Sequence, residues 1–345
     1  MTATADDRST DGRSIVVIGA SAGGVQALSL LIEKLPQDLR AAVFVVLHIP
    51  PSSPSSLHRI LARKSGLRVV VAQDGEAITD RTVYVASADR HLMIDNGCIR
   101  LTRGPKESRA RPAIDVLFRS AATAYGPRVI GVVLTGALDD GTAGLWAVKD
   151  RGGLAFAQDP KMAEHSSMPE SAIAHVDVDF VGTVEAIAHK IVQAVDGDGE
   201  QAMTSTKDAQ FEIENSIAMN GRGMEAGVMD LGKVSKYTCP DCHGVMVQIE
   251  DGPITRFRCH TGHAFSIKSL IAEVNDSIDE GLWDTLRAIE ERIMLLQQMA
   301  DLADRSSASA EARSYRQQAE DTERRLKPLR ELVLDPHFFG HDTSD

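Results

Sequence analysis

The sequence predicts an α/β protein: a mostly parallel, doubly wound sheet with helices on both faces, followed by a small zinc ribbon and a C-terminal helical hairpin. Three observations support this prediction. Short runs of Val and Ile alternate with helix-like segments in the first half of the chain. Cysteines and histidines crowd one later segment. Apolar residues then recur at heptad-like spacing near the C-terminus.

The first half reads as strands alternating with helices, with one hairpin inserted at the turn Asn96-Gly97. Alternation of this kind is typical of a parallel three-layer domain, here residues 14–195. Buried strands are expected at residues 15–18, 41–49, 129–134, 154–157 and 176–181.

A glycine-rich turn follows the first strand and leads into a helix. The segment Gly19-Ala-Ser-Ala-Gly23 fits the Gly-x-Ser-x-Gly nucleophile elbow, which exposes a serine hydroxyl at the sheet edge. The N–H groups of Ala22 and Gly23, at the start of the helix, could then hold an oxyanion. A phosphate-binding turn is the alternative, although Ser21 replaces the second fingerprint glycine and no Gly-Lys-Ser/Thr follows.

Two further polar positions follow buried strands. His48 ends the second strand, and Asp139 and Asp140 follow the strand at residues 129–134. Open α/β sheets place their sites where strands end, so these residues could converge on Ser21 as base and orienting carboxylate. Read singly, His48 could be a core histidine and either aspartate a helix cap.

Several stretches resemble the catalytic domain of the chemotaxis protein-glutamate methylesterase family (CheB-type). They cover nearly all of residues 14–195 in matching order: Ile18-Gly-Ala-Ser-Ala-Gly-Gly24, Val46-Leu-His-Ile49, Arg111-Pro-Ala-Ile-Asp-Val-Leu-Phe-Arg-Ser-Ala121, Val133-Leu-Thr-Gly-Ala-Leu-Asp-Asp-Gly141, Gln158-Asp-Pro160 and Met168-Pro-Glu-Ser-Ala-Ile173. The resemblance implies a triad of Ser21, His48 and Asp140. It also implies hydrolysis of glutamate γ-methyl esters on chemoreceptors, often with deamidation of receptor glutamines, without a catalytic cofactor.

Two residues depart from the family pattern. Ala22 stands where a threonine is usual, and Ala137, expected to line the substrate site, stands where a methionine is usual. Family members commonly begin with a receiver domain, but about a dozen residues precede the first strand here. Regulation by a receiver in the same chain is therefore not expected, and the alternative function is a non-chemotactic scaffold or sensor whose extension recruits partners.

A second group of residues has metal-ligand spacing. Cys239-Pro-Asp-Cys242 is followed after sixteen residues by Cys259-His-Thr-Gly-His263. This layout predicts a structural zinc ribbon with ligands Cys239, Cys242, Cys259 and His263. His260 competes for the fourth place, and redox sensing by the cysteine pair is an alternative. The fourth cysteine, Cys98, is expected to be a strand residue without chemistry.

Two late segments carry apolar residues three and four positions apart. The first includes Leu282, Leu286, Ile289, Ile293 and Leu296, and the second Tyr315, Ala319, Thr322, Leu326, Leu329 and Val333. This spacing predicts a helical hairpin or coiled coil. The two helices could pack only on each other, form a homodimer, or dock on a helical partner such as the receptor bundle.

Composition limits the other possibilities. A net charge of -12 and a pI near 5.4 argue against nucleic acid as the main partner. The lack of a membrane-length apolar run or a signal peptide predicts a cytoplasmic protein that is not membrane-embedded. The predicted organisation is a tail (1–13), a catalytic domain (14–195), an acidic linker (196–236), the ribbon (237–267), the hairpin (268–335) and a tail (336–345).

Overall fold

The computed structural model describes residues 14–51, 56–197, 209–335 and 338, and the chain divides into two compact units, Met1–Leu270 and Ile271–Asp345. Apart from Phe338, the predicted tails lie outside the described residues, as does the stretch 198–208 of the predicted linker. Among the described helices, none is long and apolar enough to cross a membrane.

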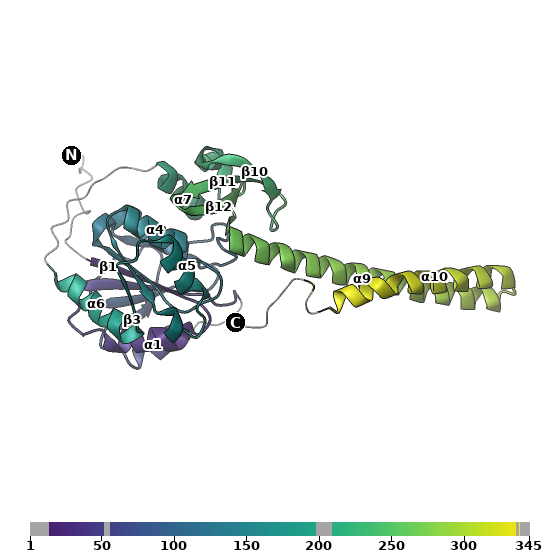
Figure 1. The fold of residues 1–345 in the computed structure, drawn as a ribbon, viewed down its shortest axis with the longest axis horizontal. Coiled ribbons are helices and arrows are strands. Elements are labelled where there is room, and N and C mark those ends of the chain that lie inside the picture. The colour runs from purple at the N-terminus through teal and green to yellow at the C-terminus, as the bar shows by residue number, and fades with distance from the viewer. Residues whose placement is uncertain (1–13, 52–55, 198–208, 336–337, 339–345) are drawn as a thin grey trace. The chain divides into compact units, whose positions relative to one another are not determined.

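The first unit is built on a seven-stranded parallel sheet with the order β3-β4-β2-β1-β7-β8-β9. Figure 1 shows this sheet with helices on either side of it. Its core strands are nearly continuous Val, Ile and Ala, as expected of strands covered on both faces. The sheet confirms the predicted fold class. Its strands are β1 (Ser14–Ala20), β2 (Ala41–Leu47), β3 (Arg68–Val71), β4 (Thr82–Val85), β7 (Val129–Val133), β8 (Leu154–Gln158) and β9 (Phe180–Gly182).

Helices cover both faces of this sheet, and each face has its own buried apolar cluster. One face carries α1 (Gly24–Lys34), α2 (Leu57–Ala62) and α6 (Val184–Asp196), and the other carries α3 (Ile114–Tyr125), α4 (Thr142–Asp150) and α5 (Ser167–His175). The predicted hairpin is β5 (His91–Asp95) and β6 (Cys98–Thr102), and two short 3-10 turns are η1 (Gly126–Arg128) and η2 (Pro160–Met162).

The topology positions the site. Strand β1 lies between β2 and β7, with Ile15 in register with Ala42 and Val129. Because the three strands are parallel, their carboxyl ends meet at one edge of the sheet. The residues that follow them therefore lie close together: Ser21 after β1, His48 after β2, and the loop 134–141 after β7.

Residues 209–270, which we call the extension, continue the first unit. They form α7 (Ala209–Asn220), α8 (Gly223–Ala226), η3 (Val228–Leu231) and a small antiparallel sheet of β10 (Lys233–Thr238), β11 (Val245–Asp251), β12 (Ile254–Cys259) and β13 (Ala264–Ser266). The linker prediction therefore differs from the structure over residues 209–236. Helix α7 buries Phe211, Glu214 and Ile217, and a buried acid is easily misread as part of a solvated acidic stretch.

The second unit consists of two long helices, α9 (Ile267–Arg305), which begins in the first unit, and α10 (Ser309–Val333). Their facing apolar side chains form one cluster that includes Leu286, Ile293 and Leu296 of α9 and Ala319 and Leu326 of α10. The heptad-like spacing thus corresponds to a helical hairpin.

Candidate active site and metal cluster

Ser21 lies on a tight turn between β1 and α1. Gly23 at the start of α1 has φ +72°, a left-handed conformation that favours glycine. Gly136, in the loop after β7, lies directly against this turn. A Cβ at position 136 would lie 2.1 Å from Met168 Sδ and 2.8 Å from Ser21 Cβ, so a side chain there would clash with both residues. The backbone N–H of Ser21 donates to Thr135 O at 3.0 Å and fixes the turn to the loop after β7.

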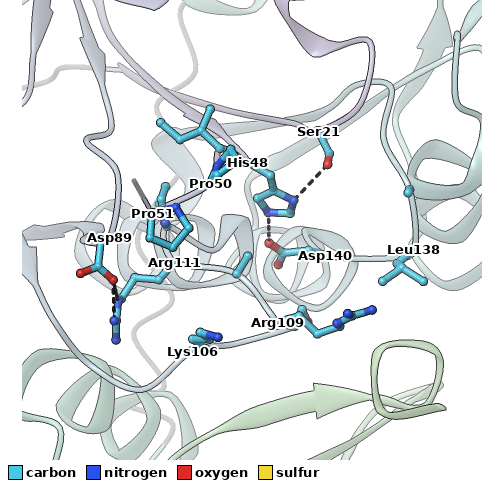
Figure 2. A pocket seen from close by; sticks show the side chains of 15 residues that line it. Ser21, His48, Pro50, Pro51, Asp89, Lys106, Arg109, Arg111, Leu138 and Asp140 are labelled. Atoms are coloured by element: carbon cyan, nitrogen blue, oxygen red, sulfur yellow. Dashed lines mark hydrogen bonds and ion pairs between the residues drawn. The ribbon is translucent and has the colours of Figure 1, made fainter. Parts of the chain in front are cut away.

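The structure brings the three residues of the predicted triad together (Figure 2). The Nδ1 atom of His48 lies 3.2 Å from Ser21 Oγ, and the Nε2 atom lies 2.7 Å from Asp140 Oδ2. The His48 side chain is 20% exposed and that of Asp140 is 3% exposed. An Nε2–H tautomer would donate to Asp140 and leave Nδ1 free to accept the serine proton.

Asp140 is held by backbone N–H groups as well as by His48. Ile114 N and Asp115 N, in the first turn of α3, donate to its two carboxylate oxygens at 2.7 and 3.1 Å. Gly141 N adds a third bond at 2.9 Å. The positive end of the α3 dipole favours a carboxylate here, and the three bonds fix the orientation of the Asp140 side chain against His48.

The neighbouring Asp139 carboxylate hydrogen-bonds to β13. Its Oδ1 atom accepts a hydrogen bond from Ser266 Oγ in β13 at 2.7 Å. Burial raises the pKa of the Asp139 carboxyl, and that hydrogen bond only partly opposes the effect. Of the two carboxylates that the sequence left open, the geometry thus places Asp140 against the imidazole.

Two backbone donors remain available beside the serine. Among the described residues, the N–H groups of Ala22 and Gly23 donate no hydrogen bond to another backbone or side-chain group. The Thr135 hydroxyl donates to Ala22 O at 3.0 Å and so orients the first of these peptides. Their position at the start of an eleven-residue helix suits a developing negative charge.

A pocket of about 430 Å³ opens in front of Ser21. Ala137 and Leu138 border it on one side, and Leu138 adopts φ +62°, which the bond from Ser167 Oγ to its carbonyl at 3.0 Å helps to hold. Basic side chains that sequence reasoning missed border it elsewhere: Lys106, Arg109 and Arg111, the last bound to Asp89. The basic run before Pro112 was the available signal.

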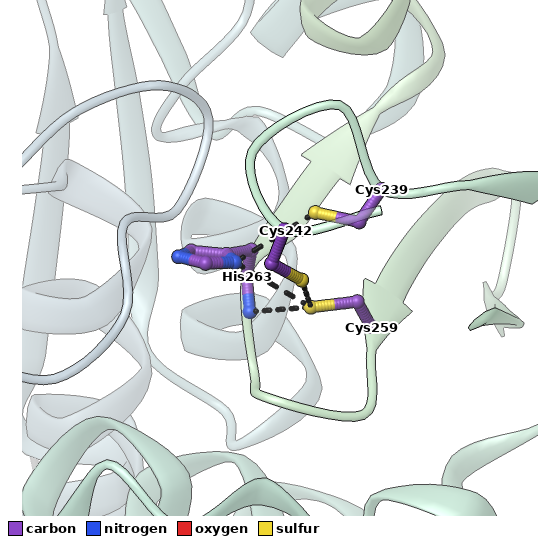
Figure 3. A group of neighbouring side chains, drawn as sticks. All are labelled: Cys239, Cys242, Cys259 and His263. Atoms are coloured by element: carbon purple, nitrogen blue, oxygen red, sulfur yellow. Dashed lines mark hydrogen bonds between the residues drawn. The ribbon is translucent and has the colours of Figure 1, made fainter. Parts of the chain in front are cut away.

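The Cys/His cluster (Cys239, Cys242, Cys259 and His263) forms in the small sheet, with all ligand atoms within 4.8 Å of one another (Figure 3). The distances are 3.6 Å from Cys242 Sγ to Cys259 Sγ and 3.5 Å from Cys259 Sγ to His263 Nδ1. Ligands about 2.0–2.3 Å from a tetrahedral ion lie about 3.5–3.8 Å apart, so the cluster fits a bound metal.

The rival ligand His260 lies outside this cluster. Its ring packs against the backbone of Gly244, where an added Cβ would fall 1.9 Å from Cε1. Within the cluster, hydrogen bonding with Cys239 lowers the pKa of the Cys259 thiol to about 2, and hydrogen bonding with Cys259 raises the pKa of His263 to about 9. A metal ion would displace the protons that these groups share.

Comparison with known proteins finds relatives of the first unit. Residues 16–191 match the family model described as CheB methylesterase. A protein-glutamate methylesterase/protein-glutamine glutaminase of Methanosarcina mazei is 41% identical over 194 residues, covering 54% of this chain and 53% of the relative, so the chain spans about half of its length.

Two other known proteins match this chain over almost their whole length. A relative from Leptospira interrogans, named for the same two activities, is 38% identical over 187 residues, which are 54% of this chain and 97% of the relative. The crystal structure of the Thermotoga maritima CheB methylesterase catalytic domain superposes with a TM-score of 0.51 and 37% identity, covering 52% of this chain and 98% of that one. The chain therefore belongs to the CheB methylesterase family.

Proposed function

We propose that the protein hydrolyses glutamate γ-methyl esters on chemoreceptors in the cytoplasm, with Ser21, His48 and Asp140 as the catalytic residues. The observation that carries the proposal is the hydrogen-bonded series from Ser21 Oγ through His48 to Asp140 at the mouth of an open pocket. The names of the relatives add glutamine deamidation as a second activity of the same site.

The reaction follows from the geometry. His48 Nδ1 accepts the Ser21 proton while Oγ attacks the ester carbonyl carbon, and the N–H groups of Ala22 and Gly23 stabilise the oxyanion. Collapse of the intermediate transfers the proton from His48 to the methoxy group, so methanol leaves and a seryl ester remains. A water molecule, deprotonated by His48, then releases the glutamate carboxylate and restores Ser21.

Asp140 orients His48 and stabilises the transient imidazolium, and three backbone N–H donors hold its carboxylate in place. A glutamine side chain enters the same path with ammonia as the leaving group. Ala137 leaves room at the pocket wall where a larger side chain would narrow it, which suits an ester side chain presented from a helix surface.

We further propose that the Cys/His cluster binds a structural Zn²⁺ ion. Four protein ligands leave no open coordination position for a substrate, so the metal would stabilise the small sheet and take no part in ester hydrolysis. For the second unit, we propose docking on a helical-bundle partner such as the receptor. Sedimentation of the purified chain tests this proposal, because a homodimer would show that the helices pair with a second copy instead.

Methanol release from methylated receptor membranes tests the esterase proposal. The intact chain should release methanol, whereas Ser21→Ala should not, because no other described side chain occupies the place of its Oγ beside His48 Nδ1. Ser87→Ala is the matched control, since Ser87 also follows a strand of the sheet but lies outside the pocket lining. Absence of release by the intact chain, with Ser21 present, would contradict the proposal.

A further inference from the structure

A short loop connects the candidate active site with the extension. Residues 104–111, which we call the pocket loop, contribute Lys106, Ser108 and Arg109 to the lining of the Ser21 pocket. Glu107, between them, is instead 2% exposed and lies among charged residues of the extension. One side of the pocket loop therefore faces the substrate space, and the other is buried against the extension.

Strand β13 supports the pocket loop through its backbone. Ser108 N donates to Ala264 O at 2.8 Å, and Ala264 N donates to Lys106 O at 3.1 Å, so Glu107 and Ala264 form a parallel bridge. Ala264 directly follows His263, a member of the Cys/His cluster. The support for the pocket loop is thus covalently adjacent to a candidate metal ligand.

Buried charges make a second connection between the same elements. The Glu107 carboxylate accepts bonds from Arg119 Nη2 of α3 at 2.9 and 3.1 Å, and Arg258 Nη2 of β12 lies 2.9 Å from it. Arg258 directly precedes the cluster residue Cys259. The full set, which we call the ionic cluster, has three acids and three arginines: Glu107, Glu214, Asp251, Arg119, Arg256 and Arg258.

The extension also contacts the other side of the active site. Ser266 Oγ, in β13, donates to Asp139 at 2.7 Å, and Asp139 directly precedes Asp140. The pocket itself is lined only by residues between Ser21 and Asp140 among those described. The extension therefore supports two walls of the pocket from behind without covering its mouth.

We propose that the metal-loaded Cys/His cluster acts as a clamp that fixes the pocket loop in its substrate-binding conformation, so that metal loss loosens this loop. Strand β13 has only three residues, at the short end of strand lengths, and within the small sheet it pairs with β12 alone. Metal ligation by the neighbouring His263 would stabilise this strand further, because metal binding is coupled to folding. The clamp acts on the pocket that contains Ser21. Its effect on kcat/KM rests on the proposed esterase function, whereas its effect on the mobility of the pocket loop does not.

Amide hydrogen exchange, read by mass spectrometry on the full chain, tests the clamp. The protein is compared zinc-loaded and after zinc removal with a chelator. Loss of the two bonds to Ala264 should accelerate exchange in the pocket loop by about tenfold or more, because each backbone bond contributes about a factor of five. Peptides from β1 and β2 should keep their protection and show that the catalytic domain remains folded.

Three variants make the comparison specific. Cys242→Ser should reproduce the effect of zinc removal, whereas Cys98→Ser, which changes a cysteine outside the cluster, should behave as wild type. Ala264→Pro removes the N–H that bonds Lys106 O while leaving all four ligands, so it should retain zinc and still loosen the pocket loop.

Pocket-loop exchange that is the same with and without zinc, in a chain that demonstrably loses the metal, would overturn the proposal. The exchange readout needs no substrate, so it stands or fails independently of methanol release. Where methanol is released, zinc removal should lower kcat/KM at least fivefold, and an unchanged kcat/KM would contradict the clamp.

Discussion

Glu214 is the residue through which the ionic cluster can be tested most sharply. Its carboxylate is fully buried on α7 and bonds Arg256 at 2.8 and 2.9 Å and Arg258 at 2.7 Å, with Arg119 at 3.7 Å. Burial alone would raise the pKa of Glu214, but the Arg119, Arg256 and Arg258 guanidinium groups lower it well below its usual value of 4.5. At pH 7 the side chain is therefore ionised and its full contribution to stability is present.

Glu214→Ala leaves three arginines against two acids in the buried cluster. Removal of one partner from a buried ion pair costs about 3–5 kcal/mol, because the remaining charge is neither solvated nor paired. That is a large share of a typical stability of about 5–15 kcal/mol. We expect a loss of about 3–5 kcal/mol, shrinking as the pH falls through the folded-state pKa of Glu214.

Trp146 can report this loss. Its ring lies 6.1 Å from the ring of Phe211 on α7, in edge-to-face contact, so its fluorescence follows the contact of the extension with α4. In a Trp283→Phe background, Trp146 is the only tryptophan, and urea unfolding at pH 7 gives the free energy.

The matched control is Glu212→Ala, an exposed acid on the same helix, which should change stability by less than about 0.5 kcal/mol. A Glu214→Ala effect below about 1 kcal/mol, or one equal to that of Glu212→Ala, would refute the reasoning.

Three other changes have defined outcomes. Asp140→Asn should lower methanol release by about 10³–10⁴-fold with little change in KM, because the charge that stabilises the imidazolium is lost; a tenfold effect or less would contradict its role. Gly136→Ala forces a Cβ toward Met168 and Ser21 and should cost about 1–3 kcal/mol in urea unfolding, together with most of the activity. Burial raises the pKa of Asp115, so ionising its carboxyl destabilises the folded protein. The free energy of unfolding of Asp115→Asn should therefore increase relative to wild type as the pH rises from about 4, and level off above the folded-state pKa of Asp115. A difference between the two proteins that stays constant with pH would contradict the raised pKa.

The sheet and the convergence of the triad residues were predictable because both follow from local patterns. Apolar runs mark parallel strands, and parallel strands bring their carboxyl ends together, so Ser21, His48 and the Asp139-Asp140 pair had to lie near one edge. The positions of Asp139 and Asp140 in the sequence do not, however, decide which of the two carboxylates lies against His48. That choice depends on the first turn of α3, whose N–H groups bind only Asp140.

The connection between extension and pocket was not predictable from the sequence. Glu107, Glu214 and Arg258 are far apart in the chain, and each looks like an ordinary surface charge when read alone. Their pairing arises only when β12 and α7 pack against α3. The same packing holds the helices and the strand of residues 209–236, whose acidic composition predicts a linker.

The central claim is that Ser21 is a nucleophile activated by His48. Reaction of the full chain with a fluorophosphonate, followed by peptide mass spectrometry, measures this directly without a receptor. We predict a single adduct on Ser21, and a labelling rate that falls by at least a hundredfold in His48→Gln while His58→Gln, a histidine outside the pocket, stays unchanged. An adduct on another residue, or equal labelling in His48→Gln, would contradict the claim.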